Sequence, residues 1–268
     1  MEVLEEGVRH MKQPLLETKN LGIQFGGLKA VDGLDLQIFP QELVGLIGPN
    51  GAGKTTVFNL LTSVYKPTTG QVFFNGEDTL PLRPFELARG GIARTFQNIR
   101  LFKSLSVLDN VRIAGAQRTS YGIFGPLLLS QEFLQQEESL KEKSLELLHI
   151  FGLDVKAQEI AGSLSYGEQR KLEIVRALAT DPRLICLDEP AAGLNHQETH
   201  DLMKTIGKIR QDFKLAVLLI EHDMKLVMGI CERIFVLDHG VKIAEGTPKE
   251  IQNSKTVIEA YLGPEELA

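Results

Sequence analysis

Residues 43–56 read LVGLIGPNGAGKTT, an apolar run that leads without a break into a glycine-rich turn. The run predicts a buried strand, and TVFNLL at residues 56–61 predicts a helix after the turn. Glycine lets the backbone fold so that successive N–H groups point inward and enclose an anion at the helix N-terminus. A pattern as short as GxxxxGKT can also arise by chance or as a structural turn. The strand before it and the helix after it favour a nucleotide phosphate loop.

The side chains of this loop suit a nucleotide bound with magnesium. Lys54 would neutralise the β- and γ-phosphates, and the Thr55 hydroxyl would bind the metal ion. The predicted contacts of the loop with the nucleotide are Gly48, Pro49, Asn50, Gly51, Ala52, Gly53, Lys54, Thr55 and Thr56.

Composition and charge limit the class of protein. The 268 residues, 43% apolar and 24% charged, can form one sizeable core or two small domains. A net charge of -6, with no basic cluster among aromatic residues, argues against a nucleic-acid partner. The apolar run Leu215–Ile220 is far shorter than the roughly 20 residues that cross a bilayer, and the N-terminus lacks a signal-like apolar segment. We therefore expect a cytoplasmic location, no transmembrane segment, and buried thiols at Cys186 and Cys231.

The patterns along the chain predict an α/β fold. Strands are expected at residues 15–23, 34–38 and 71–74, and they suggest an antiparallel flank. From Tyr166 helices and strands alternate, with helices at 170–179, 197–210 and 224–230 and strands at 184–187 and 215–220, which implies a parallel sheet. Two strands at 234–237 and 241–243 and helices from Pro248 complete this core.

The stretch between these regions predicts a helical insert, with helices at residues 107–114 and 134–150. Residues 119–130 contain glycine and proline and predict a loop, although Leu127–Leu129 could also pack on a partner. Both alternatives stay open.

Two adjacent carboxylates follow the apolar run LICL at residues 184–187. Buried parallel strands present functional groups at their carboxyl ends, so Asp188 would hold magnesium and Glu189 would activate water as a general base. Two acids that merely end a strand in solvent are common, but a phosphate loop in the same chain favours the catalytic interpretation.

The sequence LSYGEQ at residues 164–169 resembles the signature of ATP-binding-cassette (ABC) ATPases. Walker A at Gly48–Thr55, Walker B at Leu184–Asp188, Gln97 and His222 complete the ordered motif set, and the resemblance covers residues 14–262. It implies a P-loop NTPase core with a mainly parallel sheet, an antiparallel β flank and a helical insert subdomain. The implied core is 14–97 with 163–262, the helical subdomain is about 98–162, and 1–13 and 263–268 form a polar leader and a tail.

In that family two domains meet head to tail, and each ATP lies between the phosphate loop of one and the signature of the other. The resemblance therefore assigns Ser165, Tyr166, Gly167 and Glu168 to the partner's nucleotide. A serine that caps a helix leaves N–H groups and a positive dipole end that can face a γ-phosphate. Without the other motifs, Ser-x-Gly-Glu would indicate simple helix capping.

Three more residues take roles from the resemblance. His222 matches the switch histidine at the γ-phosphate, Gln97 matches the Q-loop glutamine at magnesium, and Phe25 matches an aromatic that stacks on adenine. A packed histidine, a loop amide and a core phenylalanine are the alternatives. The expected catalytic set is Glu189, His222 and Gln97, and the expected magnesium set is Thr55, Gln97 and Asp188.

Two positions depart from the family pattern. Tyr166 stands where glycine is commonest, and Asn195 stands where the D-loop usually has aspartate. Asparagine keeps the hydrogen bonding of aspartate and loses its charge, so both changes bear on communication across a dimer.

Longer matches point to a subfamily. The segments 25–31, 94–102, 164–172, 188–195, 220–228 and 260–263 resemble the larger-type ATPase of high-affinity branched-chain amino-acid importers. This implies a peripheral subunit on the cytoplasmic face of the cell (inner) membrane that powers integral permease subunits, beside a second ATPase and an extracytoplasmic substrate-binding protein. Residues 98–110 are expected to meet the permease, because Gln97 ties them to the γ-phosphate region.

The rivals are of three kinds. Related ABC systems import urea, amides or other amino acids or export lipopolysaccharide, and the ATPase does not touch the cargo. Soluble cassette ATPases of repair or translation carry two cassettes, a coiled coil or zinc cysteines, which this chain lacks. A non-catalytic module is disfavoured by Glu189 and His222.

Overall fold

A computed structural model describes residues 13–118 and 130–262. The chain forms two compact units. Unit 1 contains the residues up to Leu87 and those from Gly207 onward, and unit 2 contains Ala88–Ile206. The loop or partner contact predicted at 119–130 falls almost wholly outside the described residues, as do most of the polar leader and the whole tail.

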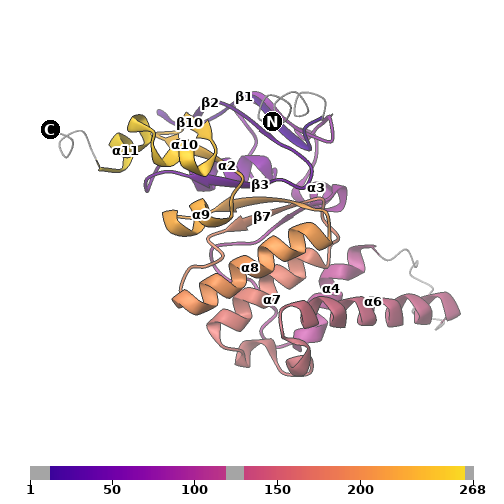
Figure 1. Cartoon of the computed structure of the whole chain (residues 1–268). Coiled ribbons are helices and arrows are strands. Elements are labelled where there is room, and N and C mark those ends of the chain that lie inside the picture. Colours follow the sequence, from indigo (N-terminus) through magenta and orange to yellow (C-terminus); the bar gives the residue numbers. More distant parts are fainter. Residues whose placement is uncertain (1–12, 119–129, 263–268) are drawn as a thin grey trace. The chain divides into compact units, whose positions relative to one another are not determined.

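An antiparallel sheet forms one part of unit 1 (Figure 1). Its strands are β1 (Leu16–Phe25), β2 (Leu28–Ile38), β4 (Thr69–Phe74) and β5 (Glu77–Asp78), in the order β2-β1-β4-β5. In β2 the side chains of Leu34, Leu36 and Ile38 are buried while those between them are exposed, so one face packs on the core. The predicted antiparallel flank is confirmed. Both hairpin strands are longer than predicted, because the pairing continues to Phe25 opposite Leu28.

A second group of strands in unit 1 includes the strand that leads into the phosphate loop. β3 (Leu43–Ile47) is buried along its whole length and pairs in parallel with β8 (Ala216–Ile220) and β9 (Arg233–Asp238). β10 (Val241–Gly246) is antiparallel to β9. The helices of this unit are α2 (Lys54–Leu61), α9 (Met224–Ile230), α10 (Pro248–Gln252) and α11 (Lys255–Leu262). The predicted parallel sheet is therefore confirmed.

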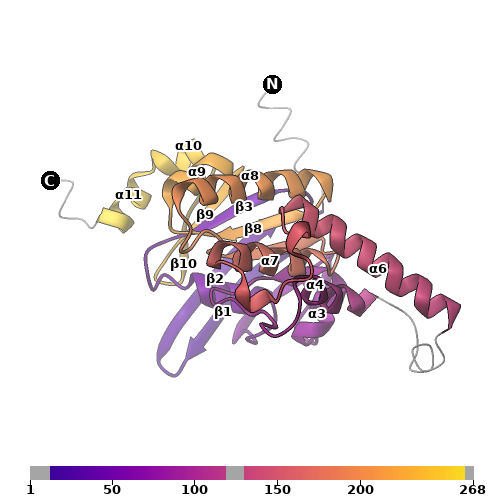
Figure 2. The same cartoon turned by 90° about the horizontal axis from the view of Figure 1, so that it is seen from below.

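Unit 2 is mainly helical. β6 (Ile92–Arg94) pairs in parallel with β7 (Leu184–Asp188), and α4 (Val107–Gly115) packs against both α6 (Gln131–Ile150) and α7 (Tyr166–Leu178). Figure 2 shows α6 as the long helix beside α4. The remaining helices are α3 (Pro84–Gly90), which crosses from unit 1, α8 (His196–Asp212), which crosses back, and the 3-10 turns η1 (Ala116–Arg118), η2 (Asp154–Lys156) and η3 (Ala161–Ser163). The helices predicted at 107–114 and 134–150 are confirmed, whereas β5, α3 and β6 were not predicted.

Both cysteines are buried and unpaired, as predicted. Burial raises the pKa of the Cys186 thiol and that of the Cys231 thiol to about 12, since a low-dielectric surrounding disfavours the thiolate. Among the described helices, none combines the length and apolar composition that a membrane crossing requires.

A buried ion pair joins strands of unit 1. The guanidinium of Arg233 on β9 lies 2.8 Å from a carboxylate oxygen of Glu42, which precedes β3, and also pairs with Glu245 on β10. The Arg233 and Glu42 side chains are only 12% and 9% exposed, so the Glu42 charge depends on Arg233 for compensation.

We expect Arg233→Met to lower the free energy of unfolding by about 3 kcal/mol, because Glu42 would remain as a buried, uncompensated carboxylate. The matched control is Lys29→Met, which removes an ion pair with Asp32 whose side chains are 61% and 50% exposed and should cost less than about 1 kcal/mol. Urea unfolding of both variants measures the difference. Equal losses of unfolding free energy in the two variants would show that burial does not raise the cost of removing Arg233.

Candidate active site

The phosphate loop in unit 1 is shaped by glycines. Gly48 and Gly53 have φ angles of 154° and 99°, and a Cβ at these positions would lie 2.1 Å from the Leu237 carbonyl oxygen and 2.6 Å from that of Ala30. The N–H of Gly240 donates to the carbonyl of Ala52 at 3.0 Å. Neighbouring backbone therefore sets the loop's path, and only glycine fits at the two contacts.

Lys54 lies within the loop. Its side chain is buried, and Nζ donates hydrogen bonds to the carbonyls of Gly48 at 2.6 Å and Pro49 at 2.9 Å. The ammonium group thus stands at the mouth of a turn of backbone amides, where its charge favours an anion.

The N-terminus of α2 suits a phosphate group. Gly53 is its N-cap and supplies no side-chain hydrogen bond, and the first turn contains no acidic residue. Thr55 in this turn is exposed. Backbone N–H groups, a positive dipole end and a glycine-lined turn therefore come together as an anion cradle.

An aromatic pair marks the end of β1. Phe25 is 47% exposed, and its ring meets the edge of Tyr65 with centroids 5.4 Å apart. Phe25 is therefore not a core residue, which was the alternative interpretation. Tyr65 was missed by the sequence analysis, since 40 positions separate it from Phe25 and no pattern links them.

The carboxyl ends of β3 and β8 lie side by side in unit 1, because Leu46 pairs with Ile220. Glu221 follows β8 and is buried, while the side chain of the next residue, His222, is 62% exposed. The backbone N–H of His222 donates to the Glu221 carboxylate at 3.3 Å. His222 is thus presented at the sheet edge from which the phosphate loop also emerges.

The C-terminal helix reaches the same loop. Burial raises the pKa of the Tyr261 hydroxyl on α11, and a hydrogen bond from the backbone N–H of Gly48 opposes that shift. This contact was not foreseen, although the sequence around Tyr261 is part of the subfamily resemblance.

In unit 2, Asp188 ends the buried strand β7. Its backbone N–H donates to the Thr95 hydroxyl at 3.2 Å, and its carboxylate lies 3.8 Å from the guanidinium of Arg94. Both side chains of this pair are nearly buried, at 11% exposure for Arg94 and 6% for Asp188. The two opposite charges therefore compensate each other in a nearly buried position.

Glu189 follows in a left-handed conformation, with φ of 46°, which is rare for a residue with a side chain. Gln97 Nε2 donates to a Glu189 carboxylate oxygen at 3.3 Å. The structure therefore brings together two of the three predicted catalytic residues, Gln97 and Glu189. Local strain of this kind is often found where a side chain must be aimed at a functional site.

The signature residues begin α7. Ser165 forms a reciprocal capping box with Glu168, with Ser165 N–H to carboxylate at 3.0 Å and Glu168 N–H to hydroxyl at 3.4 Å. Hydrogen bonding from Lys156 is the main cause that lowers the pKa of Glu168, although burial acts in the other direction. Tyr166 is 49% exposed. The turn is thus a well-formed helix start at the surface of unit 2.

Asn195 caps the start of α8. Its N–H donates to Glu198 at 2.9 Å, and its side-chain oxygen accepts from the Glu198 N–H at 2.9 Å. The neutral amide therefore performs the same capping role that aspartate would perform.

The donor set suits magnesium rather than a metal caged by protein ligands. Over residues 13–118 and 130–262, no group of three or more His, Cys, Asp or Glu side chains could hold a metal ion. The Thr55 hydroxyl, the Gln97 amide and the Asp188 carboxylate offer oxygen ligands of the kind that Mg²⁺ uses together with water and substrate phosphates.

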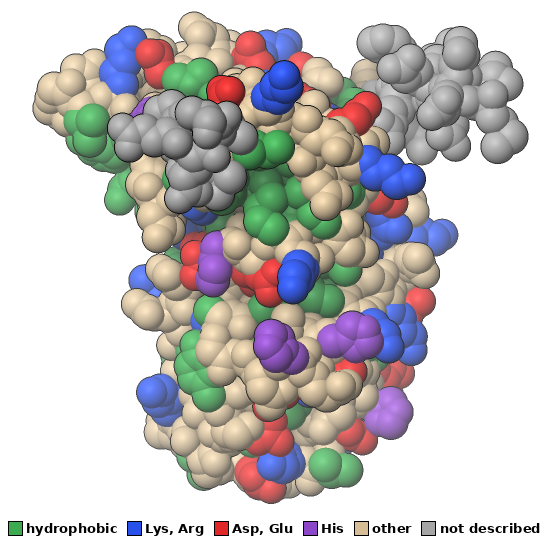
Figure 3. Space-filling model, turned by 60° about the vertical axis from the view of Figure 1, so that its left-hand side comes forward, with side chains coloured by type: hydrophobic (Ala, Val, Ile, Leu, Met, Phe, Trp, Pro, Cys, Tyr) green, Lys and Arg blue, Asp and Glu red, His purple; other side chains and the backbone are tan. Residues whose placement is uncertain are grey.

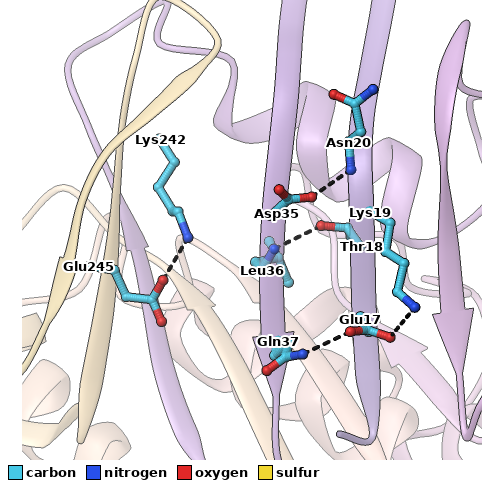
Figure 4. Close-up of a pocket in the computed structure, with 9 residues that line it drawn as sticks. All are labelled: Glu17, Thr18, Lys19, Asn20, Asp35, Leu36, Gln37, Lys242 and Glu245. Carbon is cyan, nitrogen blue, oxygen red and sulfur yellow. Dashed lines mark hydrogen bonds and ion pairs between the residues drawn. The ribbon is translucent and has the colours of Figure 1, made fainter.

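Besides the loop, the described part of unit 1 contains a polar groove and an apolar groove. A groove of about 520 Å³ between β1, β2 and β10 is polar, but its charged groups already pair, Lys242 with Glu245 at 2.6 Å and Lys19 with Glu17 at 3.3 Å (Figure 4). An apolar groove of about 570 Å³ lies between α9, α10 and α11 and includes Met224, Met228 and Tyr261. On the face drawn in Figure 3, basic and acidic side chains of the described residues are interspersed.

Two family models match the chain. The model described as ABC transporter matches residues 31–192, and the model described as branched-chain amino acid ATP-binding cassette transporter matches residues 241–263.

Individual proteins resemble the chain over nearly its whole length. It is 46% identical over 253 residues to the high-affinity branched-chain amino acid transport ATP-binding protein LivG of Escherichia coli K12, covering 94% of this chain and 99% of the relative. The ADP conformation of MJ1267, an ATP-binding cassette of an ABC transporter, matches with a TM-score of 0.81 and 32% identity, covering 94% of this chain and 99% of that one. A dimeric post-hydrolysis structure of the cassette MJ0796 with ADP and Pi matches with a TM-score of 0.74 and 26% identity, covering 87% and 98%.

We expect Gly48→Ala to weaken nucleotide binding at least about tenfold, equivalent to about 1.4 kcal/mol, because its Cβ would meet backbone at 2.1 Å and the loop would have to shift. The control is Gly76→Ala, where φ is +80° but no atom lies within 4 Å of the added Cβ. That variant should lose only about 1–2 kcal/mol of stability and keep its affinity. Titration with a fluorescent nucleotide compares them, and unchanged affinity of Gly48→Ala would contradict the close fit.

Proposed function

The chain belongs to the ABC transporter family of ATPases, and from this membership we propose that it powers an importer of branched-chain amino acids. The observation that carries the cargo class is the match of residues 241–263 to the branched-chain amino-acid transporter model. These residues form β10, α10 and α11, and Tyr261 of α11 contacts the phosphate loop.

Nucleotide binding is assigned to unit 1. The backbone of residues 48–56 and the ammonium of Lys54 would hold the phosphates, and the half-exposed ring of Phe25, supported by Tyr65, would stack on adenine. The glycine contacts and the uncapped start of α2 support this assignment.

Hydrolysis is assigned to three side chains. Glu189 would accept a proton from the attacking water, His222 would contact the γ-phosphate, and Gln97 would orient the water beside Glu189. Bound Mg²⁺, held by Thr55, Gln97 and Asp188, would neutralise the charge on the β- and γ-phosphates. Arg94 lies 3.8 Å from the Asp188 carboxylate, and its positive charge would help to hold that side chain in place.

The partner in the reaction is a second ATPase subunit, identical or related. The exposed start of α7 at Ser165–Glu168 would face the partner's nucleotide, and the dimeric MJ0796 cassette supports such an assembly. ATP would then hold two subunits together, because each supplies groups that the other lacks.

Integral permease subunits at the cytoplasmic face of the membrane are the proposed site of action, with a substrate-binding protein on the other side. Residues 98–110, which follow Gln97 and lead into α4, are proposed as the permease contact. The division into a core and a helical subdomain at 98–162 stays a prediction.

We predict that Glu189→Gln retains ATP binding and a stabilised dimer but loses single-turnover hydrolysis by between about 10²- and 10⁴-fold, because the amide cannot accept the proton. Lys54→Ala is the comparison, since it should lose binding itself. Chromatography with ATP and phosphate release measure the two properties. Equal hydrolysis by Glu189→Gln and wild type would remove Glu189 from the base role.

For the cargo, we expect cells that lack the chain to lose most high-affinity leucine uptake, and the wild-type chain but not Lys54→Ala to restore it. Uptake of labelled leucine, isoleucine and valine is measured beside urea. Restored urea uptake with unchanged leucine uptake would identify a different importer.

A further inference from the structure

A charged side chain is buried in unit 2. Arg170 on α7 is only 1% exposed and is the largest of the fully buried side chains in the described part of the chain. Arginine is almost never buried to this degree unless it is paired and hydrogen-bonded. The partners of Arg170 therefore explain how its charge can be buried.

The guanidinium of Arg170 holds the backbone around Gln97. One terminal nitrogen donates to the Phe96 carbonyl at 2.8 Å, and the other donates to the Gln97 carbonyl at 2.8 Å. The planar fork of arginine can reach two consecutive carbonyls at once.

Glu173 lies one turn further along α7, and together with Arg170 it forms a clamp on the backbone of residues 96–100. Its carboxylate lies 3.1 Å from the Arg170 guanidinium and accepts the N–H groups of Phe96 and Arg100, each at 3.4 Å. Burial raises the pKa of Glu173, and the charge of Arg170 opposes that shift. The pair thus binds two backbone carbonyls and two backbone N–H groups within residues 96–100.

The same guanidinium reaches the start of the signature helix. It donates to the Tyr166 hydroxyl at 3.1 Å, and a Cβ at Gly193 would lie 2.8 Å from the Tyr166 ring. Tyr166 therefore connects Arg170 to the segment that follows Glu189. A glycine at position 166 could not make this connection.

We propose that Arg170 is a positioning residue for hydrolysis that holds Gln97 in place beside Glu189 and couples it to the signature turn through Tyr166. The proposal rests on the catalytic roles proposed above for Gln97 and Glu189. Arg170 itself would touch neither nucleotide nor water. It acts by fixing the backbone from which the Gln97 side chain reaches Glu189 at 3.3 Å.

The first test is Arg170→Lys, assayed on the full chain under steady-state conditions. Lysine keeps the charge beside Glu173 but cannot span the two carbonyls and the Tyr166 hydroxyl. We expect kcat to fall by about 10- to 100-fold, since misplacement by about 1 Å has such effects, with KM for ATP within about twofold of wild type. A normal kcat, or a loss confined to KM, would overturn the proposal.

Arg233→Lys is the matched control, because it also removes the fork of a buried, ion-paired arginine, but in unit 1. It should lower thermal stability and leave kcat within about twofold of wild type. An equal fall in kcat for both variants would mean that general destabilisation explains the effect.

A double-mutant cycle with Gln97→Ala separates positioning from a purely structural role. If Arg170 acts through Gln97, Arg170→Lys should lower kcat by less than about twofold when Gln97 is already alanine. Independent, multiplicative losses would overturn the proposal. A wild-type kcat for Gln97→Ala alone would instead reject the catalytic role of Gln97, and the inference with it.

Should Arg170→Lys fail to fold, the double variant Arg170→Gln with Glu173→Gln removes both charges and leaves no buried ion unpaired. It should show the same fall in kcat at unchanged KM. Full activity of this folded variant would show that the clamp is dispensable.

Discussion

Close approach of backbone to backbone governs the phosphate loop. A Cβ on Gly48 would lie 2.1 Å from the Leu237 carbonyl oxygen, and one on Gly53 would lie 2.6 Å from the Ala30 carbonyl oxygen, so no side chain fits at either position. These contacts join the loop after β3 to the end of β9 and to β2. The loop therefore holds its shape through its neighbours, and Lys54 can rest on the Gly48 and Pro49 carbonyls in a turn that is already formed. Preformed amides of this kind need little reorganisation when an anion arrives.

In unit 2, side chains hold an irregular backbone segment in place. The segment after β6 leaves its sheet at Thr95, and Arg170 and Glu173 take over as partners for its backbone. A buried ion pair contributes little net stability as a rule, and its value here is geometric, because it specifies one arrangement of residues 96–100. Glycine contacts and a guanidinium clamp are thus two ways of holding irregular backbone without a strand or helix.

Much of the fold could be predicted because β3, β7 and β8 are continuous apolar runs, and the chain after each of them carries a recognisable motif. The short elements β5, α3 and β6 were missed, since a three-residue strand such as Ile92–Arg94 shows no periodicity. In the site, contiguous residues such as Gly48–Thr56 were recognisable. Arg170 was not, because the two partners that link it to Gln97 are backbone carbonyls, which every residue has. The one signal was an arginine and a glutamate three positions apart among the apolar residues of α7. Tyr65 meets Phe25 only through tertiary packing.

The buried cysteines bear on how the molecule can be studied. The chain has two, Cys186 within β7 and Cys231 at the end of α9, and neither is exposed. Since their thiols stay protonated in ordinary buffers, maleimide reagents attach slowly to either one. Spin labels or fluorophores can therefore be placed on new surface cysteines while both native ones remain, so distances between subunits during a turnover can be followed in an otherwise unaltered protein.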